Sequence, residues 1–216
     1  MIAFAACVGS PDKLAQFAAP GLQRAMEPDS VFAELTTSTS IHEAYNEALE
    51  HFATYDDLEA LVLLHEDCRL LDADFCDRVR TVLADPEVAI AGPIGATGVT
   101  GLAWWEGTIV GRVEETRGLV QGATVAGDAD ALDGLLLVLS PWAVRNLRCD
   151  TRTFTGFHAY DVDLCFQARA AGRRVVTAPL NAFHHTKGGF GDVAAWQAAD
   201  AAFRAKWAAS PAQQAA

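Results

Sequence analysis

The chain has 216 residues, of which 51% are hydrophobic, and a formal net charge of −12 at pH 7. This length and apolar content suffice for one hydrophobic core, so a single domain is predicted. The acidic balance excludes a nucleic-acid-binding protein, which normally presents a basic surface to phosphates. The apolar runs are too short for a membrane span, and the N-terminus lacks the basic flank and cleavage site of a signal peptide. We therefore expect a cytoplasmic protein, with an oligomeric state that the sequence leaves open.

The first 91 residues alternate between strand and helix patterns. Apolar runs predict strands at residues 2–8, 31–35, 61–64 and 87–91. Helical patterns lie between them, in a short segment after Pro11 that is interrupted at Pro20-Gly21, and at residues 41–52 and 72–83. This alternation implies right-handed crossovers and a mostly parallel sheet.

Polar residues mark the starts of two of these helices. Ser10 before Pro11 is typical of a helix N-cap, although a serine at the end of the first strand is also placed to contact a nucleotide. Ser40 and Glu43 form a capping box for the helix at 41–52. Asn46 falls near the buried face of that helix, where its amide needs a partner, either in a neighbouring loop or on a ligand.

The third strand, at 61–64, runs directly into His65, Glu66 and Asp67. An unbroken apolar run is typical of a strand covered on both faces, which places the polar triplet at its carboxyl end. In open α/β sheets ligands bind at that edge, so the triplet is a candidate metal or phosphate site. The alternative is that these residues simply begin a loop.

Residues 92–134 are rich in glycine and lack helix signals, which predicts short strands, one of them at 108–113, and a mobile flap. Trp104 and Trp105 stand in the middle of this region as either a local core or a stacking surface for a ligand ring. Another buried strand is expected at 135–139. It is preceded by Asp133 and Gly134, where a glycine permits close backbone approach.

The last part of the chain carries further polar candidates. A loop at 153–160 leads into a helix at 161–172 that begins with Asp161 and ends in glycine. The run 174–179 is predicted as the last sheet strand. His184 and His185 lie beside glycines, which predicts an irregular segment, and imidazole is a common metal ligand. A final helix carries Trp196. The five cysteines are scattered, which predicts buried thiols rather than disulfides or a zinc site.

The order of these motifs over residues 2–190 resembles the family 2 nucleotide-sugar glycosyltransferases of GT-A fold. The resemblance implies an α/β protein with a single GT-A (Rossmann-like) domain. Its central, mostly parallel mixed sheet is flanked by helices and followed by an irregular acceptor-side half. The implied boundaries are 1–210 for the domain, with a nucleotide-sugar-binding half at 1–91, an acceptor-side half at 92–191, a C-terminal helix at 192–210 and a frayed tail at 211–216.

The resemblance also implies roles for the candidate residues. Asp67 matches the last carboxylate of the family's D-x-D motif, which holds a divalent cation (Mn²⁺ or Mg²⁺) on the donor diphosphate, and His65 departs from the usual aspartate of that motif. Asp161 matches the general base, and His184 matches the late metal-binding histidine, with His185 as its alternative. Four residues are expected to contact the donor: Ser10, Asn46, His65 and Glu66. Four others are expected to contact the sugar or the acceptor: Trp104, Trp105, Asp133 and Gly134.

These assignments predict an inverting, metal-dependent glycosyltransferase that uses a nucleotide-sugar donor, most commonly a UDP-sugar in the resembling family, and an unknown acceptor. A cation would attract the anionic donor to an acidic protein and stabilise its leaving group. A carboxylate base would contribute roughly 10²- to 10⁴-fold. The alternatives are a nucleotide-sugar hydrolase or nucleotidyltransferase, and a catalytically weak nucleotide-sugar-binding module.

Overall fold

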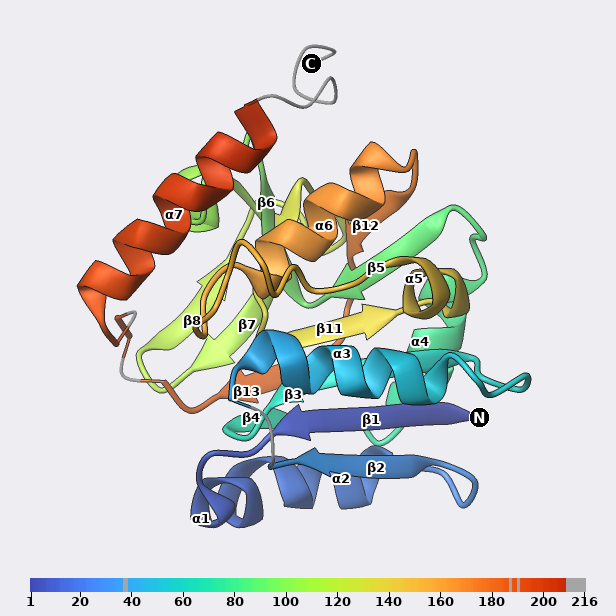
Figure 1. Cartoon of the computed structure of the whole chain (residues 1–216). Helices are drawn as coiled ribbons and strands as arrows, with labels where there is room; N and C mark the ends of the chain where they lie inside the picture. Colours follow the sequence, from blue (N-terminus) through green and yellow to red (C-terminus); the bar gives the residue numbers. More distant parts are fainter. Residues whose placement is uncertain (37–38, 187, 190, 209–216) are drawn as a thin grey trace.

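The computed structural model describes residues 1–36, 39–186, 188–189 and 191–208 as an α/β protein built on two sheets (Figure 1). The tail predicted at 211–216 lies outside the described residues. Within the described part, no helix combines the length and apolar character needed to cross a bilayer.

The central sheet has seven strands and is mixed. In spatial order they are β2 (Val31–Leu35), β1 (Ile2–Cys7), β3 (Ala60–His65), β11 (Leu136–Leu139), β5 (Val88–Gly92), β12 (Arg174–Thr177) and β9 (Gly127–Asp128). β11 runs antiparallel to both of its neighbours, whereas β2, β1, β3, β5 and β12 share one direction. The predicted mostly parallel mixed sheet is confirmed.

A second sheet lies at the carboxyl ends of β1 and β3 (Figure 1). Its strands are β10 (Ala131–Leu132), β6 (Ile94–Thr97), β7 (Thr108–Glu115), β13 (Ala182–His184) and β4 (Cys68–Leu70), with β8 (Gly118–Gln121) paired to β7. The prediction that 174–179 is the last strand was therefore wrong. The irregular segment predicted for the two histidines was wrong for His184, which ends β13, whereas His185 lies outside the strand. The three residues of β13 are held by pairing with β4 and β7, which lie far away in the chain.

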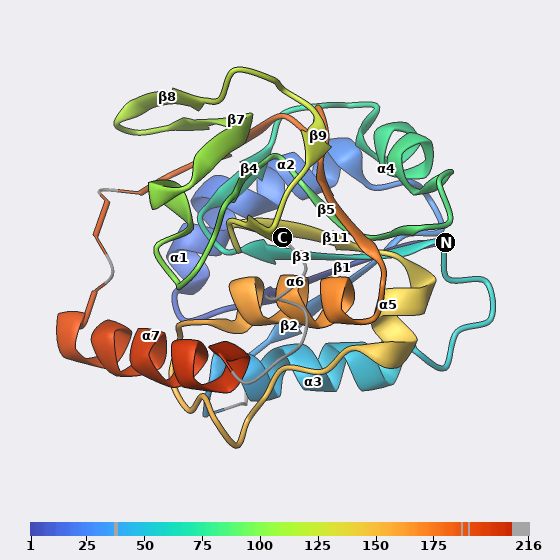
Figure 2. The ribbon, with the colours of Figure 1, turned by 90° about the horizontal axis from the view of Figure 1, so that it is seen from above.

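Helices cover both faces of the central sheet, with α3, α5 and α6 on one face and α2 and α4 on the other (Figure 2). The helical segments are α1 (Pro11–Lys13), η1 (Leu14–Ala18), α2 (Ala19–Ala25), α3 (Ile41–Phe52), α4 (Phe75–Leu83), η2 (Trp104–Glu106), α5 (Pro141–Asn146), α6 (Tyr160–Ala170) and α7 (Val193–Ala208).

Pro20 and Gly21 do not interrupt the first helical segment, contrary to the prediction. Pro20 stands in the first turn of α2, where a missing backbone N–H is tolerated. Gly21 faces the backbone of β4, and a Cβ there would lie 2.5 Å from the amide nitrogen of Leu70. The glycine therefore serves close packing between α2 and β4 rather than a turn.

The predicted helix starts agree with the structure. The hydroxyl of Ser10 accepts a hydrogen bond from the backbone N–H of Lys13. Ser40 accepts one from the N–H of Glu43, whose carboxylate reaches back to the N–H of Thr39. These side chains satisfy backbone donors that have no partner inside the helices.

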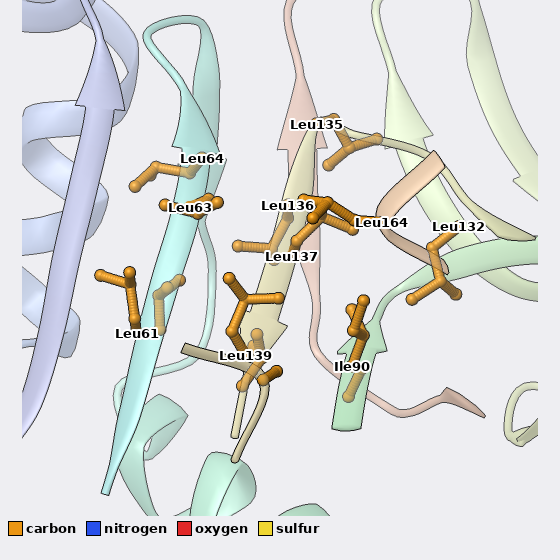
Figure 3. Close-up of a cluster of buried hydrophobic side chains, with 14 of the residues drawn as sticks. Leu61, Leu63, Leu64, Ile90, Leu132, Leu135, Leu136, Leu137, Leu139 and Leu164 are labelled. Atoms are coloured by element: carbon orange, nitrogen blue, oxygen red, sulfur yellow. The ribbon is translucent and has the colours of Figure 1, made fainter. Parts of the chain in front are cut away.

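A cluster of buried hydrophobic side chains lies where β3, β11 and β5 run side by side (Figure 3). Every residue from Ala60 to Leu64 is 0% exposed, as the unbroken apolar run predicts. The five cysteines all lie in the described part of the chain and are free thiols, four of them buried.

A buried carboxylate anchors the C-terminal helix α7 to α6. Asp163 is only 1% exposed and accepts hydrogen bonds from Lys206 Nζ at 2.9 Å, Trp207 Nε1 at 2.9 Å and Gln167 Nε2 at 2.7 Å. Phe203 of α7 also packs edge-on against Phe166 of α6, with ring centroids 5.0 Å apart. The charge of Asp163 is thus compensated almost entirely by α7.

We expect Asp163→Ala to lower the free energy of unfolding by about 1–3 kcal/mol, because it leaves the buried indole N–H of Trp207 without its acceptor and removes one of the two carboxylates that pair with half-buried Lys206. Urea denaturation followed by circular dichroism measures the change. Asp56→Ala, at an exposed turn, serves as the control and should change stability by less than about 0.5 kcal/mol. Equal stability of the two variants would contradict the anchoring role of Asp163.

Candidate functional site

A cleft of about 760 Å³ opens at the carboxyl end of β3, between the second sheet and the first turn of α6. One part of its wall is polar and includes His65, Asp67, Glu115, Arg117, Asp133, Tyr160, Asp161, His184 and Thr186. Another part is apolar and includes Ile94, Leu102, Trp104, Trp105, Val113, Val120, Phe157 and Trp196. Such a cavity has the size and mixed lining of a small-molecule site.

Strand pairing brings three potential metal ligands together in the polar part. His65 ends β3, Asp67 follows in the turn to β4, and His184 pairs with Cys68 across β4 and β13. Ligand atoms of the three residues all lie within 4.8 Å of one another, and His184 Nε2 is 3.5 Å from Asp67 Oδ1. His184 Nδ1 is buried and has no hydrogen-bond partner among the described residues.

Two imidazoles and a carboxylate at this spacing fit one divalent ion. Burial and the nearby charge of His184 lower the pKa of His65 to about 4, so its ring is neutral and retains a lone pair at pH 7. Burial would raise the pKa of Asp67, but the hydrogen bond to His184, the positive charges that His65 and His184 carry in acid, and the charge of Lys13 outweigh it and lower that pKa to about 2. Asp67 is therefore ionised at pH 7 and available as a metal ligand.

His185, the alternative to His184, faces elsewhere. Its ring stacks on Phe17 with centroids 4.0 Å apart, and its backbone N–H donates to the carbonyl oxygen of Asp67 at 2.9 Å. His184 is the last residue of β13, and His185 follows it with its ring on Phe17, so only one histidine of the pair faces Asp67.

A second polar group, formed by Asp133 and Asp161, lies where Gly134 approaches the first turn of α6. Asp161 Oδ2 accepts a hydrogen bond from the N–H of Gly134 at 3.0 Å. Burial and the charge of Asp133 raise the pKa of Asp161 to about 7, and burial also raises the pKa of Asp133. Asp161 is thus a carboxylate that can take up a proton near neutral pH.

Gly134 allows this approach because it has no side chain. A Cβ at this position would lie 2.1 Å from the hydroxyl oxygen of Tyr160 and 2.9 Å from Cβ of Asp161. Ala159, the residue directly before α6, has a φ of +84°, which lies in the left-handed region that is costly for a residue with a side chain. Backbone strain therefore coincides with the point where Tyr160 and Asp161 enter the cleft.

The residues expected on the donor side differ in placement. Glu66 accepts hydrogen bonds from the N–H groups of Gly9 and Ser10 at 2.8 and 2.7 Å, which ties the end of β1 to the turn after β3. Asn46 exchanges two hydrogen bonds with the backbone of Cys149, so its amide finds its partner in a neighbouring loop of the chain. Ser10, Asn46 and Glu66 are not among the residues that line the cleft.

The sequence leaves open whether Trp104 and Trp105 form a local core or a stacking surface for a ligand ring, and the structure places one tryptophan in the core and the other at the surface. Trp104 is 8% exposed and belongs to the core, whereas Trp105 is 41% exposed, and both line the cleft. Trp105 lies 6.1 Å, between ring centroids, from Trp196 of α7.

Sequence reasoning missed several contributors, among them Tyr160, Trp196 and Lys13. Tyr160 could have been suggested by its position directly before Asp161, and Trp196 by its place in the last helix. Lys13, whose Nζ lies 3.5 Å from Asp67 Oδ2, had no distinguishing local signal.

The chain matches one protein-family model, described as a glycosyltransferase-like family, over residues 12–205. It is similar to the streptomycin biosynthesis protein StrF of Streptomyces griseus, with 29% identity over 201 residues that cover 91% of this chain and 71% of that protein.

Solved structures resemble the fold at low identity. The chain is similar to A197 from STIV, with a TM-score of 0.55 and 14% identity over 86% of this chain and 85% of that one. GalNAc-T7, solved with UDP, GalNAc and Mn²⁺, gives a TM-score of 0.60 and 8% identity over 86% of this chain and 44% of that one. The mannosyltransferase PcManGT from Pyrobaculum calidifontis, solved with GDP-Man and Mn²⁺, gives a TM-score of 0.55 and 15% identity over 88% of this chain and 58% of that one. These likenesses concern the fold alone, and they confirm the expected GT-A fold.

We expect Mn²⁺ to raise the melting temperature of the wild-type protein, and His184→Ala to lose most of this stabilisation, because it removes one of the three clustered candidate ligands. The neighbouring His185→Ala is the matched control and should keep that stabilisation. Melting curves with and without Mn²⁺ make the comparison, and the reverse pattern would assign the ligand to His185.

Proposed function

Because the chain belongs to the glycosyltransferase-like family whose model it matches over residues 12–205, we propose that it transfers a sugar from a nucleoside-diphosphate donor to an acceptor hydroxyl, with inversion at the anomeric carbon. The observation that carries this proposal is that Asp161 faces the same cleft as the cluster of His65, Asp67 and His184. The cluster fits a divalent cation, and Asp161 fits a general base.

His65, Asp67 and His184 would hold the cation, with Mn²⁺ favoured over Mg²⁺ because imidazole nitrogen suits transition ions better than the oxygen-preferring Mg²⁺. When bound, the cation supplies Lewis-acid stabilisation of the leaving diphosphate, an effect of several kcal/mol. Lys13, 3.5 Å from Asp67, adds a positive charge on the side of β1. These groups offset the repulsion between an acidic protein and an anionic donor.

Asp161 would remove the proton of the acceptor hydroxyl as the new glycosidic bond forms. A base whose pKa lies near the working pH is best matched to this task, and burial with the neighbouring charge of Asp133 brings the pKa of Asp161 to about 7. A single carboxylate base with no covalent intermediate corresponds to direct displacement, and hence to inversion.

The division of labour follows the chain order. Residues 1–91 would bind the nucleotide sugar and residues 92–191 would form the acceptor side, followed by the C-terminal helix predicted at 192–210. Trp104, Trp105, Asp133 and Gly134 are assigned to the sugar or acceptor, since they line the cleft or border Asp161. UDP-sugars are the first donors to test.

The direct experiment is incubation of the protein with Mn²⁺, a panel of nucleotide sugars and hydroxyl-bearing acceptors, with products identified by mass spectrometry. Transfer with an inverted anomeric configuration supports the proposal. Release of the sugar to water alone would indicate a hydrolase. Formation or consumption of pyrophosphate would indicate a nucleotidyltransferase, and binding without turnover would indicate a binding module.

We expect Asp161→Asn to reduce kcat by roughly 10²- to 10⁴-fold while the donor dissociation constant stays unchanged, because the amide cannot accept the proton. Asp77→Asn, at the first turn of α4 and outside the cleft, is the matched control. Steady-state kinetics and calorimetry with a nucleoside diphosphate separate the two quantities, and undiminished turnover of Asp161→Asn would remove it from the base role.

We also expect kcat to rise with pH through about 7, because Asp161 acts only as the carboxylate and its pKa is raised to about 7. Asp133→Asn removes the neighbouring negative charge that contributes to this shift, so the acidic limb should move to lower pH. A pH profile of kcat at saturating Mn²⁺ tests both statements, and an unmoved limb in Asp133→Asn would contradict the coupling.

A further inference from the structure

The hydroxyl of Tyr160 lies between two groups that compete for one proton. It is 2.8 Å from the carbonyl oxygen of Gly134 and 2.6 Å from Nε2 of His65. Tyr160 is 2% exposed, so neither interaction is exchanged freely with water. Its ring is also packed edge-on against Tyr45, with centroids 5.1 Å apart, which restricts its movement.

Counting protons fixes the direction of both hydrogen bonds. A phenol carries one O–H, and a carbonyl oxygen can only accept, so the proton of Tyr160 points to Gly134. If it pointed to His65 instead, the carbonyl of Gly134 would lose this buried partner at a cost of about 1–3 kcal/mol. The lone pair of the phenol oxygen therefore faces His65, whose Nε2 must carry the hydrogen.

We propose that Tyr160 is a positioning residue that holds His65 in its Nε2–H tautomer and so leaves Nδ1 as the nitrogen whose lone pair is available to the metal. This inference rests on the proposed metal site. A carboxylate at position 65 would offer two equivalent oxygens and need no such control, whereas a neutral imidazole has only one lone pair. The histidine that replaces the usual aspartate thus depends on an outer partner to present the correct nitrogen.

The chain offers a matched pair of variants. Tyr160→Phe removes the hydroxyl that binds His65, and Tyr45→Phe removes a neighbouring buried hydroxyl that has no hydrogen-bond partner among the described residues. Both substitutions delete a single oxygen from the same aromatic cluster. A general effect of loosened packing would therefore appear in both, and loss of tautomer control only in the first.

The test uses long-range ¹H–¹⁵N correlation spectra of histidine-labelled protein without metal, with His65 assigned by means of His65→Gln. Wild-type protein and Tyr45→Phe should show His65 protonated at Nε2 only, whereas Tyr160→Phe should show a mixture of tautomers. Titration with Mn²⁺ alone, followed by electron paramagnetic resonance, should give a dissociation constant raised about 10- to 100-fold in Tyr160→Phe and unchanged in Tyr45→Phe.

Three results would overturn the proposal. One is a wild-type His65 protonated at Nδ1 in a protein that binds Mn²⁺, which leaves the metal site intact. Another is an unchanged Mn²⁺ affinity in folded Tyr160→Phe. The third is a wild-type protein that shows the Nε2–H tautomer but does not bind Mn²⁺; this result refutes the metal site itself. The wild-type spectrum decides the tautomer even if Tyr160→Phe fails to fold.

Discussion

The close approach of Gly134 to the start of α6 is the constraint on which the rest of the site depends. Its N–H binds the carboxylate of Asp161, and its carbonyl oxygen accepts the proton of Tyr160. Because Tyr160 also contacts His65, the backbone of one glycine connects the proposed base to the proposed metal ligands. No other residue type fits, since the space of a Cβ is already filled by Tyr160. The proposed base Asp161 and the proposed metal ligand His65 are therefore both held, directly or through Tyr160, by the backbone of Gly134 just before β11.

Burial acts in opposite directions on the two polar groups of the cleft. At the metal side, the charges around Asp67 outweigh burial and keep its pKa low, so a full negative charge is maintained there. At the base side, burial and the neighbouring charge of Asp133 are the main influences on Asp161, and both raise its pKa. The same residue type therefore carries a fixed charge at one position and an exchangeable proton at the other. An acidic protein can in this way separate the binding of a cation from the movement of a proton.

Much of the fold is predictable because its signals are local. The apolar run at 61–64 and the capped, amphipathic pattern at 41–52 each identify their element without reference to the rest of the chain. The short strands β4 and β13 carry no such signal, since three residues become a strand only by pairing with distant ones. The same limit applies to side chains. The choice between His184 and His185 depends on the short strand β13, which ends at His184 and which the sequence does not reveal. Asp163 acquires its partners 43 and 44 residues further on.

The attachment of α7 has a consequence for the thermodynamics of ligand binding. One half of this helix contributes Trp196 to the cleft wall, and the other half is tied to Asp163 through Lys206 and Trp207. The wall is complete only in molecules whose terminal helix is docked, so the docking equilibrium multiplies the intrinsic affinity for any ligand that touches it. A helix that undocks as one cooperative unit below the global melting temperature would weaken binding while most of the protein is still folded. Affinity measured against temperature would then report the local stability of the last helix rather than that of the whole domain.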